Sequence, residues 1–228
     1  MSEYIYGRNA INEAIKTGRV LELYVIEEVL RKNRFSVKTT IKKRAELDKM
    51  TNGANHQGIV AKVKSYPHYE LKDILKKEKG LIVILDGIED HQNLGAIIRT
   101  CDCAGVDGII YRRHHGLGLN ATVAKIASGA LEYVKVCEVT NLSRAIDELK
   151  AAGYCVYGTD ASAESYYNEV PYDRNVVLII GSEGKGISSL VAKKCDYMIK
   201  LPMHGHINSL NASVAAGIFI YEIIQNQK

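Results

Sequence analysis

Three glycine- and amide-rich segments each follow an apolar, strand-like run of the sequence. One runs from Gly181 through Glu183 to Gly186, another surrounds Ser209 and Asn211, and the third spans residues 93–99. Each has a bland explanation, because glycine tolerates positive φ in turns and Ser209 or Asn211 could cap a helix. Three such bends at strand ends together favour a site whose backbone groups wrap a small cofactor beside charged side chains.

Two kinds of nucleotide chemistry fit this pattern poorly. A phosphate-binding loop needs four residues between two glycines, then Lys and Ser or Thr, whereas Gly184 comes too early and Gly186 follows Lys185. The segment 116–121 matches the loose dinucleotide fingerprint, but no acidic residue ends a buried strand about 20 residues later, as the ribose contact requires. Nucleotide hydrolysis is therefore excluded, and a dinucleotide fold stays as an alternative.

Composition indicates a globular chain of 228 residues with 46% hydrophobic content and enough length for one α/β domain and a small companion. No apolar run approaches the roughly 20 residues of a membrane span, and the first residues lack a secretory apolar stretch, so we expect a cytoplasmic protein without a membrane partner. The five cysteines are odd in number and scattered among apolar residues, which predicts reduced packing residues, including Cys101 and Cys103, and no metal site.

Charge is distributed unevenly along the chain. Residues 1–66 contain 13 Lys and Arg against 7 Asp and Glu, while residues 67–228 contain 17 against 19. A basic module beside a near-neutral one favours an anionic partner such as the RNA backbone, although a solvated charged face explains the charge alone equally well.

The elements that must position the three bends follow from periodicity. Short β-branched runs alternate with helical patterns from residue 81 onward, which predicts a doubly wound α/β domain whose parallel strands are buried on both faces. Ligands bind beyond the carboxyl ends of such strands, where the bends fall. The expected strands are 81–85, 108–111, 134–137, 154–157, 176–180 and 197–201, with a final helix over 211–225.

The first 66 residues form a separate predicted α/β unit, with a helix over 9–16 and strands over 21–26 and 58–63. Pro67 disfavours helix for the residue before it and cannot donate to a β-ladder, so we place the domain boundary there. The predicted organisation is an N-terminal domain over 1–66, a linker over 67–79 that contains a charged helix of roughly 70–79, and a second domain over 80–228.

The three bends together resemble the signature motifs of the SpoU (TrmH) family of RNA ribose 2′-O-methyltransferases, in the SPOUT superfamily. The motifs occur in the family's order, and the resemblance covers essentially the whole chain. They are Asn93-x-Gly95-x-x-x-Arg99, Gly181-x-Glu183-Gly184-x-Gly186, and Leu201-Pro202-Met203 with Ser209-Leu210-Asn211-x-Ser213. Residues 6–10 and 56–61 are similar to the small RNA-binding domain of the branch that methylates guanosine in large-subunit ribosomal RNA.

The resemblance implies S-adenosylmethionine as methyl donor, a C-terminal trefoil knot, and a homodimer whose site lies at the subunit interface. Family contacts to the donor carry over to four positions of this chain: Thr159, Gly181, Leu201 and Leu210. The small residues of the last helix would then serve the knot and the contact between subunits.

The resemblance also assigns catalytic residues: Asn93, Arg99, Glu183, Ser209 and Asn211. Because a guanidinium stays charged, with a pKa above about 12, we expect Arg99 to hold the target phosphate and stabilise developing oxyanion charge rather than accept a proton. Glu183 is expected to orient Arg99 through a bidentate pair. The two Asn side chains would position ribose and loop, and Ser209 would be a hydrogen-bond partner.

The leading hypothesis is methylation of a guanosine ribose in large-subunit ribosomal RNA. A transfer RNA substrate and a noncatalytic RNA-binding assembly factor are the alternatives. Four histidines remain undecided between RNA contacts and solvated turns: His114, His115, His204 and His206.

Overall fold

The computed structural model describes residues 2–112 and 118–227. Arg113, the undecided histidines His114 and His115, and the first two residues of the 116–121 fingerprint lie outside the described part. The chain forms two compact units, each described by itself below. The first comprises residues 2–67 and 118–133, and the second comprises 68–112 and 134–227. Within these ranges, every helix is too short or too polar to serve as a membrane span.

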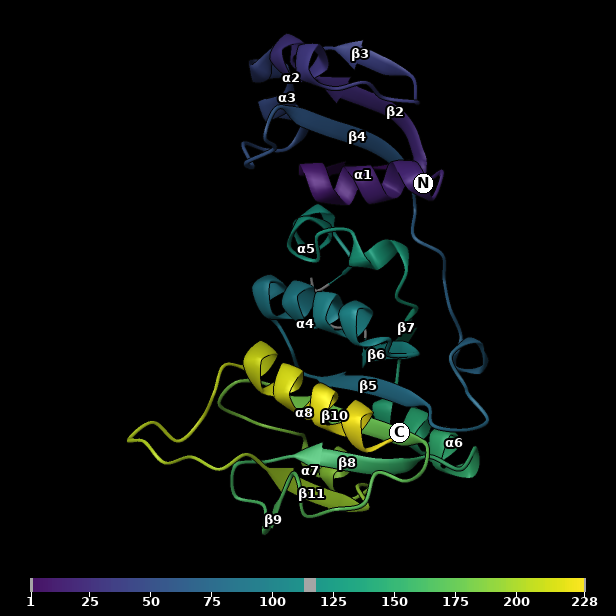
Figure 1. Cartoon of the computed structure of the whole chain (residues 1–228), viewed down its shortest axis with the longest axis vertical. Helices are drawn as coiled ribbons and strands as arrows, with labels where there is room; N and C mark the ends of the chain where they lie inside the picture. The colour runs from purple at the N-terminus through teal and green to yellow at the C-terminus, as the bar shows by residue number, and fades with distance from the viewer. Residues whose placement is uncertain (1, 113–117, 228) are drawn as a thin grey trace. The chain divides into compact units, whose positions relative to one another are not determined.

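The second unit contains a seven-stranded sheet in which all neighbours run parallel, in the order β7-β6-β5-β10-β8-β11-β9 (Figure 1). The predicted parallel α/β architecture is confirmed. Four of the six expected runs form strands within a residue of the predicted bounds. The strand predicted over 154–157 extends two residues further, to Thr159, and the one predicted over 134–137 begins at Val136 and extends to Val139. The strands are β5 (Leu81–Asp86), β6 (Gly108–Arg112), β7 (Val136–Val139), β8 (Cys155–Thr159), β9 (Ser165–Tyr166), β10 (Val176–Gly181) and β11 (Tyr197–Lys200).

Helices cover both faces of this sheet. On one face, α4 (His91–Ala104) and α8 (Ala212–Asn226) lie side by side, and α8 also contacts β10 (Figure 1). On the other, α6 (Leu142–Ala151) and α7 (Ser189–Ala192) bury a core with alternate strand residues such as Ile84 and Ile179. Successive strand side chains point to opposite faces, so every central strand is apolar throughout.

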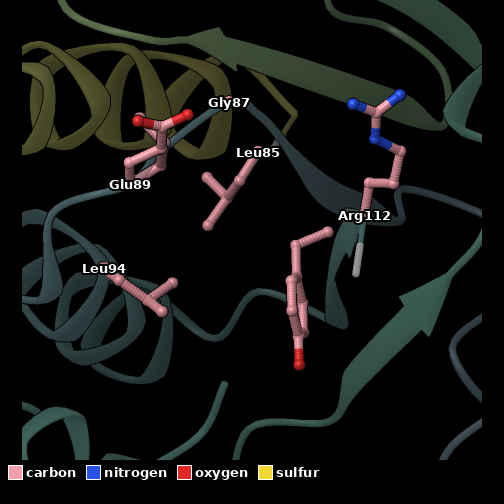
Figure 2. Close-up of a pocket in the computed structure, with 7 residues that line it drawn as sticks. Leu85, Gly87, Glu89, Leu94 and Arg112 are labelled. Atoms are coloured by element: carbon pink, nitrogen blue, oxygen red, sulfur yellow. The ribbon is translucent and has the colours of Figure 1, made fainter. Parts of the chain in front are cut away.

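A small cavity lies between the ends of β5 and β6 and the start of α4. Figure 2 shows Leu85 and Leu94 facing it, with the Glu89 carboxylate and the Arg112 guanidinium on opposite sides. Its volume of about 20 Å³ is close to the space that one water molecule needs. It is therefore too small for a cofactor.

The charged helix predicted over 70–79 is wrong, because only a single 3₁₀ turn, η1 (Leu71–Asp73), forms there. The Tyr154 hydroxyl accepts from the Lys76 N–H at 2.8 Å, and the Asn175 amide donates to the Lys76 and Lys77 carbonyls. Only Ile74 in this stretch is buried, so a helix would gain little packing. Side chains from distant strands thus satisfy the backbone instead.

The cysteines carry no disulfide, and Cys101, Cys137 and Cys155 are buried as predicted. Burial raises the pKa of the Cys137 thiol to about 11, which keeps it protonated and inert. The packing prediction for Cys103 is wrong, because this side chain is exposed. Two residues after Cys101 on α4, it points away from the sheet.

The first unit is a four-stranded sheet in the order β1-β4-β2-β3, in which β4 pairs antiparallel with β1 and β2, and β3 pairs parallel with β2. Leu23 and Val25 are fully buried on one face. Three of its elements, β2, β4 and α1, were predicted from the sequence, whereas β1, β3, α2 and α3 were not. The elements are β1 (Ser2–Tyr6), β2 (Val20–Val25), β3 (Thr39–Ile41), β4 (Ile59–Lys64), α1 (Arg8–Lys16), α2 (Glu27–Lys32) and α3 (Arg44–Met50).

The first unit also contains residues 118–133, although they lie between β6 and β7 in sequence. This segment holds α5 (Ala121–Ile126) and the 3₁₀ turn η2 (Ala130–Glu132). The Tyr6 hydroxyl hydrogen-bonds the Thr122 hydroxyl at 3.0 Å, and Lys125 Nζ donates to the Asn55 carbonyl at 2.8 Å. The range 80–228 expected for the second domain therefore includes a segment that packs with the N-terminal residues.

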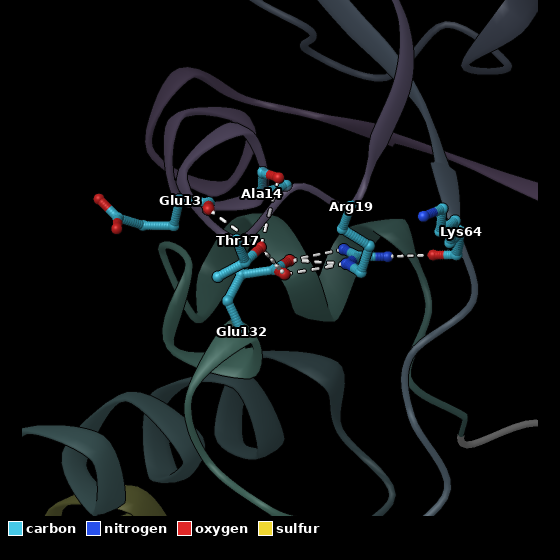
Figure 3. Close-up of polar contacts among 6 residues, drawn as sticks. All are labelled: Glu13, Ala14, Thr17, Arg19, Lys64 and Glu132. Carbon is cyan, nitrogen blue, oxygen red and sulfur yellow. Dashed lines mark hydrogen bonds and ion pairs between the residues drawn. The ribbon is translucent and has the colours of Figure 1, made fainter.

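A buried ion pair joins that segment to β2 (Figure 3). The Arg19 guanidinium donates to both oxygens of Glu132, with Nη2 to Oε1 at 2.6 Å, and to the Lys64 carbonyl. The side chains of Arg19 and Glu132 are only 7% and 3% exposed. Burial alone would lower the pKa of Arg19, but its hydrogen bonds to Glu132 raise it overall. Burial therefore does not neutralise Arg19, and both oxygens of Glu132 accept hydrogen bonds from it.

We predict that Glu132→Gln destabilises the first unit by about 3–5 kcal/mol, because it leaves the buried Arg19 charge without its counter-ion. Urea denaturation with hydrogen exchange read out at β2 and β4 measures the loss. The matched control Glu27→Gln removes an exposed ion pair with Arg31 and should cost less than about 1 kcal/mol. Equal stability of Glu132→Gln and the native chain would contradict the role assigned to this pair.

Candidate active site

One oxygen of the Glu183 carboxylate joins the three predicted motifs. Oε1 accepts the Asn93 amide at 3.1 Å, the Asn211 amide at 2.9 Å and the backbone N–H of Ala212 at 3.3 Å. Hydrogen bonds to an ionised acceptor are stronger than those between neutral groups. The start of α4, the bend after β10 and the start of α8 are therefore held together at a single atom.

Asn211 serves two elements at once. Its Oδ1 caps α8 by accepting from the backbone of Ser213 and Val214, while its Nδ2 donates to Glu183 and, at 2.9 Å, to Asn93 Oδ1. Helix capping and a role in the site are therefore compatible for Asn211, because its oxygen does the first and its nitrogen the second. Because the amide oxygen is committed to the helix, the amide nitrogen must face the other two residues.

Asn93 is fixed from its own side by a helix cap. Asp90 caps α4, since its carboxylate accepts from the backbone N–H groups of Gln92 and Asn93 at 3.2 Å. Asn93 is only 6% exposed, and its side chain reaches Glu183 and Asn211. Sequence reasoning missed Asp90, although an Asp just before a helical pattern is a helix-start signal.

The bend after β10 folds back on its own strand. Ser182 and Gly186 exchange two backbone hydrogen bonds, at 3.1 and 2.9 Å, and Gly184 and Gly186 adopt positive φ of 82° and 63°. A Cβ on Gly181 would lie 2.3 Å from the carbonyl carbon of Gly186. Glycine is therefore required at 181 by the close approach of the bend itself.

An open cavity of about 190 Å³ lies directly against this network. Its lining combines acidic groups, the Lys185 ammonium and the exposed backbone after β5. The lining residues are Gly87, Ile88, Glu89, Asp90, Asn93, Ser182, Glu183 and Lys185. The hydrogen-bonded network is thus one wall of a hollow that a small polar group can enter.

The predicted donor-binding residues gather at the carboxyl ends of three neighbouring strands. Thr159 ends β8, Gly181 ends β10, and Leu201 directly follows β11. The Thr159 hydroxyl is held by the Ile179 carbonyl at 3.0 Å, and Leu201 is nearly buried. Leu210 lies further along the loop and is half-exposed.

The loop from Leu201 to Leu210 leaves its polar backbone groups open. Within the described part of the chain, none of its N–H or carbonyl groups forms a hydrogen bond. Open backbone groups next to an apolar wall suit a ligand that has both a polar and an apolar part, as adenosine does. The residues present therefore fit a nucleoside-type cofactor.

The predicted pair between Arg99 and Glu183 is wrong. Arg99 lies six residues after Asn93 on α4 and is exposed, and no ion pair in the described ranges involves it. A helix rotates about 100° per residue, so positions six apart face different directions. Glu183 is satisfied by the two asparagines and Ala212 instead.

The remaining predicted residues lie on the exposed loop before α8. Ser209 is exposed, and among the described hydrogen bonds it has no partner, so its predicted role as a partner stays a prediction. His204 and His206 are exposed on the same loop. In residues 2–112 and 118–227, no group of three His, Cys, Asp or Glu side chains is placed to hold a metal ion.

Comparisons with known proteins agree with this geometry. The sequence profile of the SpoU rRNA methylase family matches residues 80–221, and the profile for RNA 2′-O ribose methyltransferase substrate binding matches residues 4–69. A Staphylococcus aureus (strain COL) protein assigned to the TrmH family of tRNA/rRNA methyltransferases is 42% identical over 239 residues, which cover 98% of this chain and 96% of the relative.

Two solved structures extend the likeness to the whole fold. The SpoU methyltransferase AviRb from Streptomyces viridochromogenes, in complex with the cofactor AdoMet, matches with a TM-score of 0.81 at 26% identity, covering 98% of this chain and 89% of that one. The AdoMet-bound rRNA methyltransferase from Sinorhizobium meliloti matches with a TM-score of 0.83 at 26% identity, covering 98% and 87%.

The parallel sheet and the joined motifs define an RNA methyltransferase of the SPOUT type that uses S-adenosylmethionine. The chain belongs to the SpoU, or TrmH, family of RNA 2′-O-ribose methyltransferases. The predictions of an enzyme and of this methyl donor are thereby confirmed. The dinucleotide fold and the noncatalytic factor are set aside.

We predict that Glu183→Ala lowers the stability of the second unit by about 1–3 kcal/mol, because the donors of Asn93, Asn211 and Ala212 lose their acceptor. In a double-mutant cycle with Asn93→Ala, the two losses should fall short of additivity by about 0.5–3 kcal/mol. Denaturation with hydrogen exchange at α8 reports the free energies.

The matched control cycle pairs Glu183→Ala with Glu27→Ala. Glu27 is exposed on α2, in the first unit, and shares no partner with Glu183, so these losses should add. Additivity in the Asn93 cycle as well would show that the network carries no coupling.

Proposed function

We propose that this enzyme methylates the ribose 2′-hydroxyl of a guanosine in large-subunit ribosomal RNA. The observation that carries the proposal is the Asn93–Glu183–Asn211 network, of which Asn93 and Glu183 line an open cavity at the carboxyl end of the sheet. It is supported by the basic first unit, in which Arg8, Arg34 and Arg44 are all exposed.

In this proposal Gly181, Thr159 and the loop from Leu201 to Leu210 hold S-adenosylmethionine, which supplies an electrophilic methyl group when bound. The open backbone groups of the loop bind the polar parts of the donor, and Leu201 and Leu210 contact its base. Transfer requires the attacking oxygen in line with the methyl group, so holding both partners in position accounts for much of the rate.

Arg99 is the proposed catalytic residue for the RNA side of the reaction. Its exposed guanidinium, unpaired among the described residues, is free to hold the phosphate beside the target ribose and to stabilise negative charge on the attacking oxygen. The two asparagines position the ribose, and Ser209 contributes a hydrogen bond from the exposed part of the donor loop. Glu183 acts through the asparagines rather than through Arg99.

Ribosomal RNA is favoured over transfer RNA by the first unit. Residues 4–69 match a substrate-binding profile of RNA 2′-O ribose methyltransferases, and the S. meliloti protein of the same overall fold is an rRNA methyltransferase. Transfer RNA stays as the second candidate, because the S. aureus relative belongs to a family of tRNA/rRNA methyltransferases. We place the reaction in the cytoplasm, where both RNAs reside.

We also propose that the C-terminal segment is a trefoil knot and that the enzyme is a homodimer with its site at the subunit interface. After β10 the chain forms α7 beside α6, returns as β11 and crosses to α8 beside α4. The crossing from β11 to α8 supports the proposal that the C-terminal segment passes through a loop of the chain and so forms a knot. Val214, Ile218 and Tyr221 form an exposed apolar stripe on α8, which supports a contact with a second copy.

The methylation map of ribosomal RNA tests the proposed substrate. Mass spectrometry of RNA from cells lacking the enzyme should miss one ribose methyl of a large-subunit guanosine, and the purified enzyme should restore it. Arg99→Ala should lower the rate by about 10²–10³-fold while calorimetry shows unchanged donor binding. The control Arg144→Ala alters another exposed arginine, paired with Glu148. A map that lacks a transfer RNA methyl instead would reject the ribosomal assignment.

We predict that Ile218→Glu converts the dimer to a monomer, because a carboxylate would be buried at the proposed contact. Light scattering coupled to size-exclusion chromatography measures the mass. Leu190→Glu, which alters an exposed leucine on α7, is the matched control and should leave the mass unchanged. A monomeric native chain would refute the dimer.

A further inference from the structure

One face of the sheet in the first unit carries two tyrosines and two lysines close together, with one glutamate among them. Tyr4 on β1 lies opposite Lys62 on β4, and Lys62 lies opposite Glu22 on β2. Tyr24 follows two residues after Glu22 on the same face, and Lys64 two residues after Lys62. We call Tyr4, Tyr24, Lys62 and Lys64 the tyrosine–lysine face.

This face is only half covered by the rest of its unit. At one end Tyr6 and Val60 are buried against Leu47 of α3. At the other end Tyr4 is 42% exposed, and Lys64 is exposed beside it. On the opposite face of the same sheet, Leu23, Val25 and Val63 are at 0% exposure. The core of the unit therefore lies on that face, and the half-covered end lies on the side of Tyr4 and Lys64.

The two tyrosine rings form a held pair. Their centroids lie 6.2 Å apart with the planes tilted by 54°. The Tyr24 hydroxyl donates to Glu22 Oε2 at 3.0 Å, and burial together with this hydrogen bond raises the pKa of Tyr24 to about 12, so the hydroxyl stays protonated. Tyr24 thus supports Tyr4, whose ring remains accessible.

The charges around the rings are mostly positive and partly unpaired. Glu22 is committed to its neighbours, because it also accepts the Thr40 hydroxyl at 3.0 Å and lies 3.6 Å from Lys38 Nζ. Lys62 and Lys64 take part in no side-chain ion pair within the described residues. A ring between free ammonium groups matches the chemistry of a nucleotide, which has a flat base and a charged phosphate.

We propose that the tyrosine–lysine face binds an unpaired nucleotide of the RNA substrate, with its base stacked on Tyr4 and its flanking phosphates on Lys62 and Lys64. The inference rests on the proposed function and adds a second contact with RNA. An open sheet that stacks bases on aromatic side chains is an established mode of single-strand recognition. A protein partner is disfavoured, because charged side chains interrupt the apolar surface.

Fluorescence anisotropy with labelled single-stranded A10 and U10 RNA tests the inference on the full chain. Tyr4→Leu should weaken binding at least about five-fold, since one stacked base contributes that much or more. Tyr4→Phe keeps the ring and should bind within about two-fold of the native chain. A ten-base-pair duplex, whose bases are not free to stack, should bind native and Tyr4→Leu proteins equally.

The lysines are tested by the salt dependence of A10 binding. Lys62→Gln and Lys64→Gln should each weaken binding and reduce the slope of log affinity against log salt by about 0.7. Lys16→Gln, which alters an exposed lysine paired with Glu13 on α1, should leave the A10 affinity and the salt slope unchanged. Native A10 affinity in Tyr4→Leu, or an equal loss for the duplex, would overturn the inference.

Calorimetry with S-adenosylmethionine separates this inference from the proposed function. Native donor binding by Tyr4→Leu, together with weakened A10 binding, supports the face as an RNA contact. Failure of the native protein to bind the donor would instead refute the proposed function, whatever the A10 result.

Discussion

In the second unit, a single carboxylate oxygen holds the bend after β10 to the starts of α4 and α8. Glu183 Oε1 accepts three N–H groups from elements that are distant in sequence: the first turn of α4, the side chain that caps α8, and the first backbone amide of α8. Removing one donor would leave the acceptor with the other two, whereas removing the acceptor would leave only the hydrogen bond from Asn211 to Asn93 among these groups. The site therefore depends on one anion being present and correctly placed, and Gly181 lets the bend return far enough to place it.

Beside this fixed network lies a loop that forms no internal hydrogen bonds, from Leu201 to Leu210. The hydrogen-bonded network and the open loop can contribute differently to ligand binding. Backbone groups that are already paired have little to offer a ligand, whereas open ones do, and ordering them on binding costs conformational entropy. The rigid side of the site thus fixes geometry, and the open side supplies the contacts that a bound donor must organise.

Much of the second unit could be predicted from the sequence, because buried parallel strands leave continuous β-branched runs and the motifs occupy fixed places after them. Three features of the second unit could not be predicted from the sequence. Residues 70–79 read as a helix, but Tyr154 and Asn175 bind their backbone from far away. The partner of Glu183 was chosen by charge, while the fold brought two neutral amides closer. Ala212 contributes a backbone group, which no side-chain pattern reveals.

The packing of residues 118–133 with the N-terminal residues could not be predicted for a related reason, because it is a long-range property. The first unit is therefore built from two pieces of the chain, and two strands of the seven-stranded sheet, β5 and β6, lie between these pieces in sequence. The buried Arg19–Glu132 pair has one member in each piece. A fragment cut at Pro67 would therefore keep Arg19 but lose Glu132, which would leave a buried charge without its counter-ion.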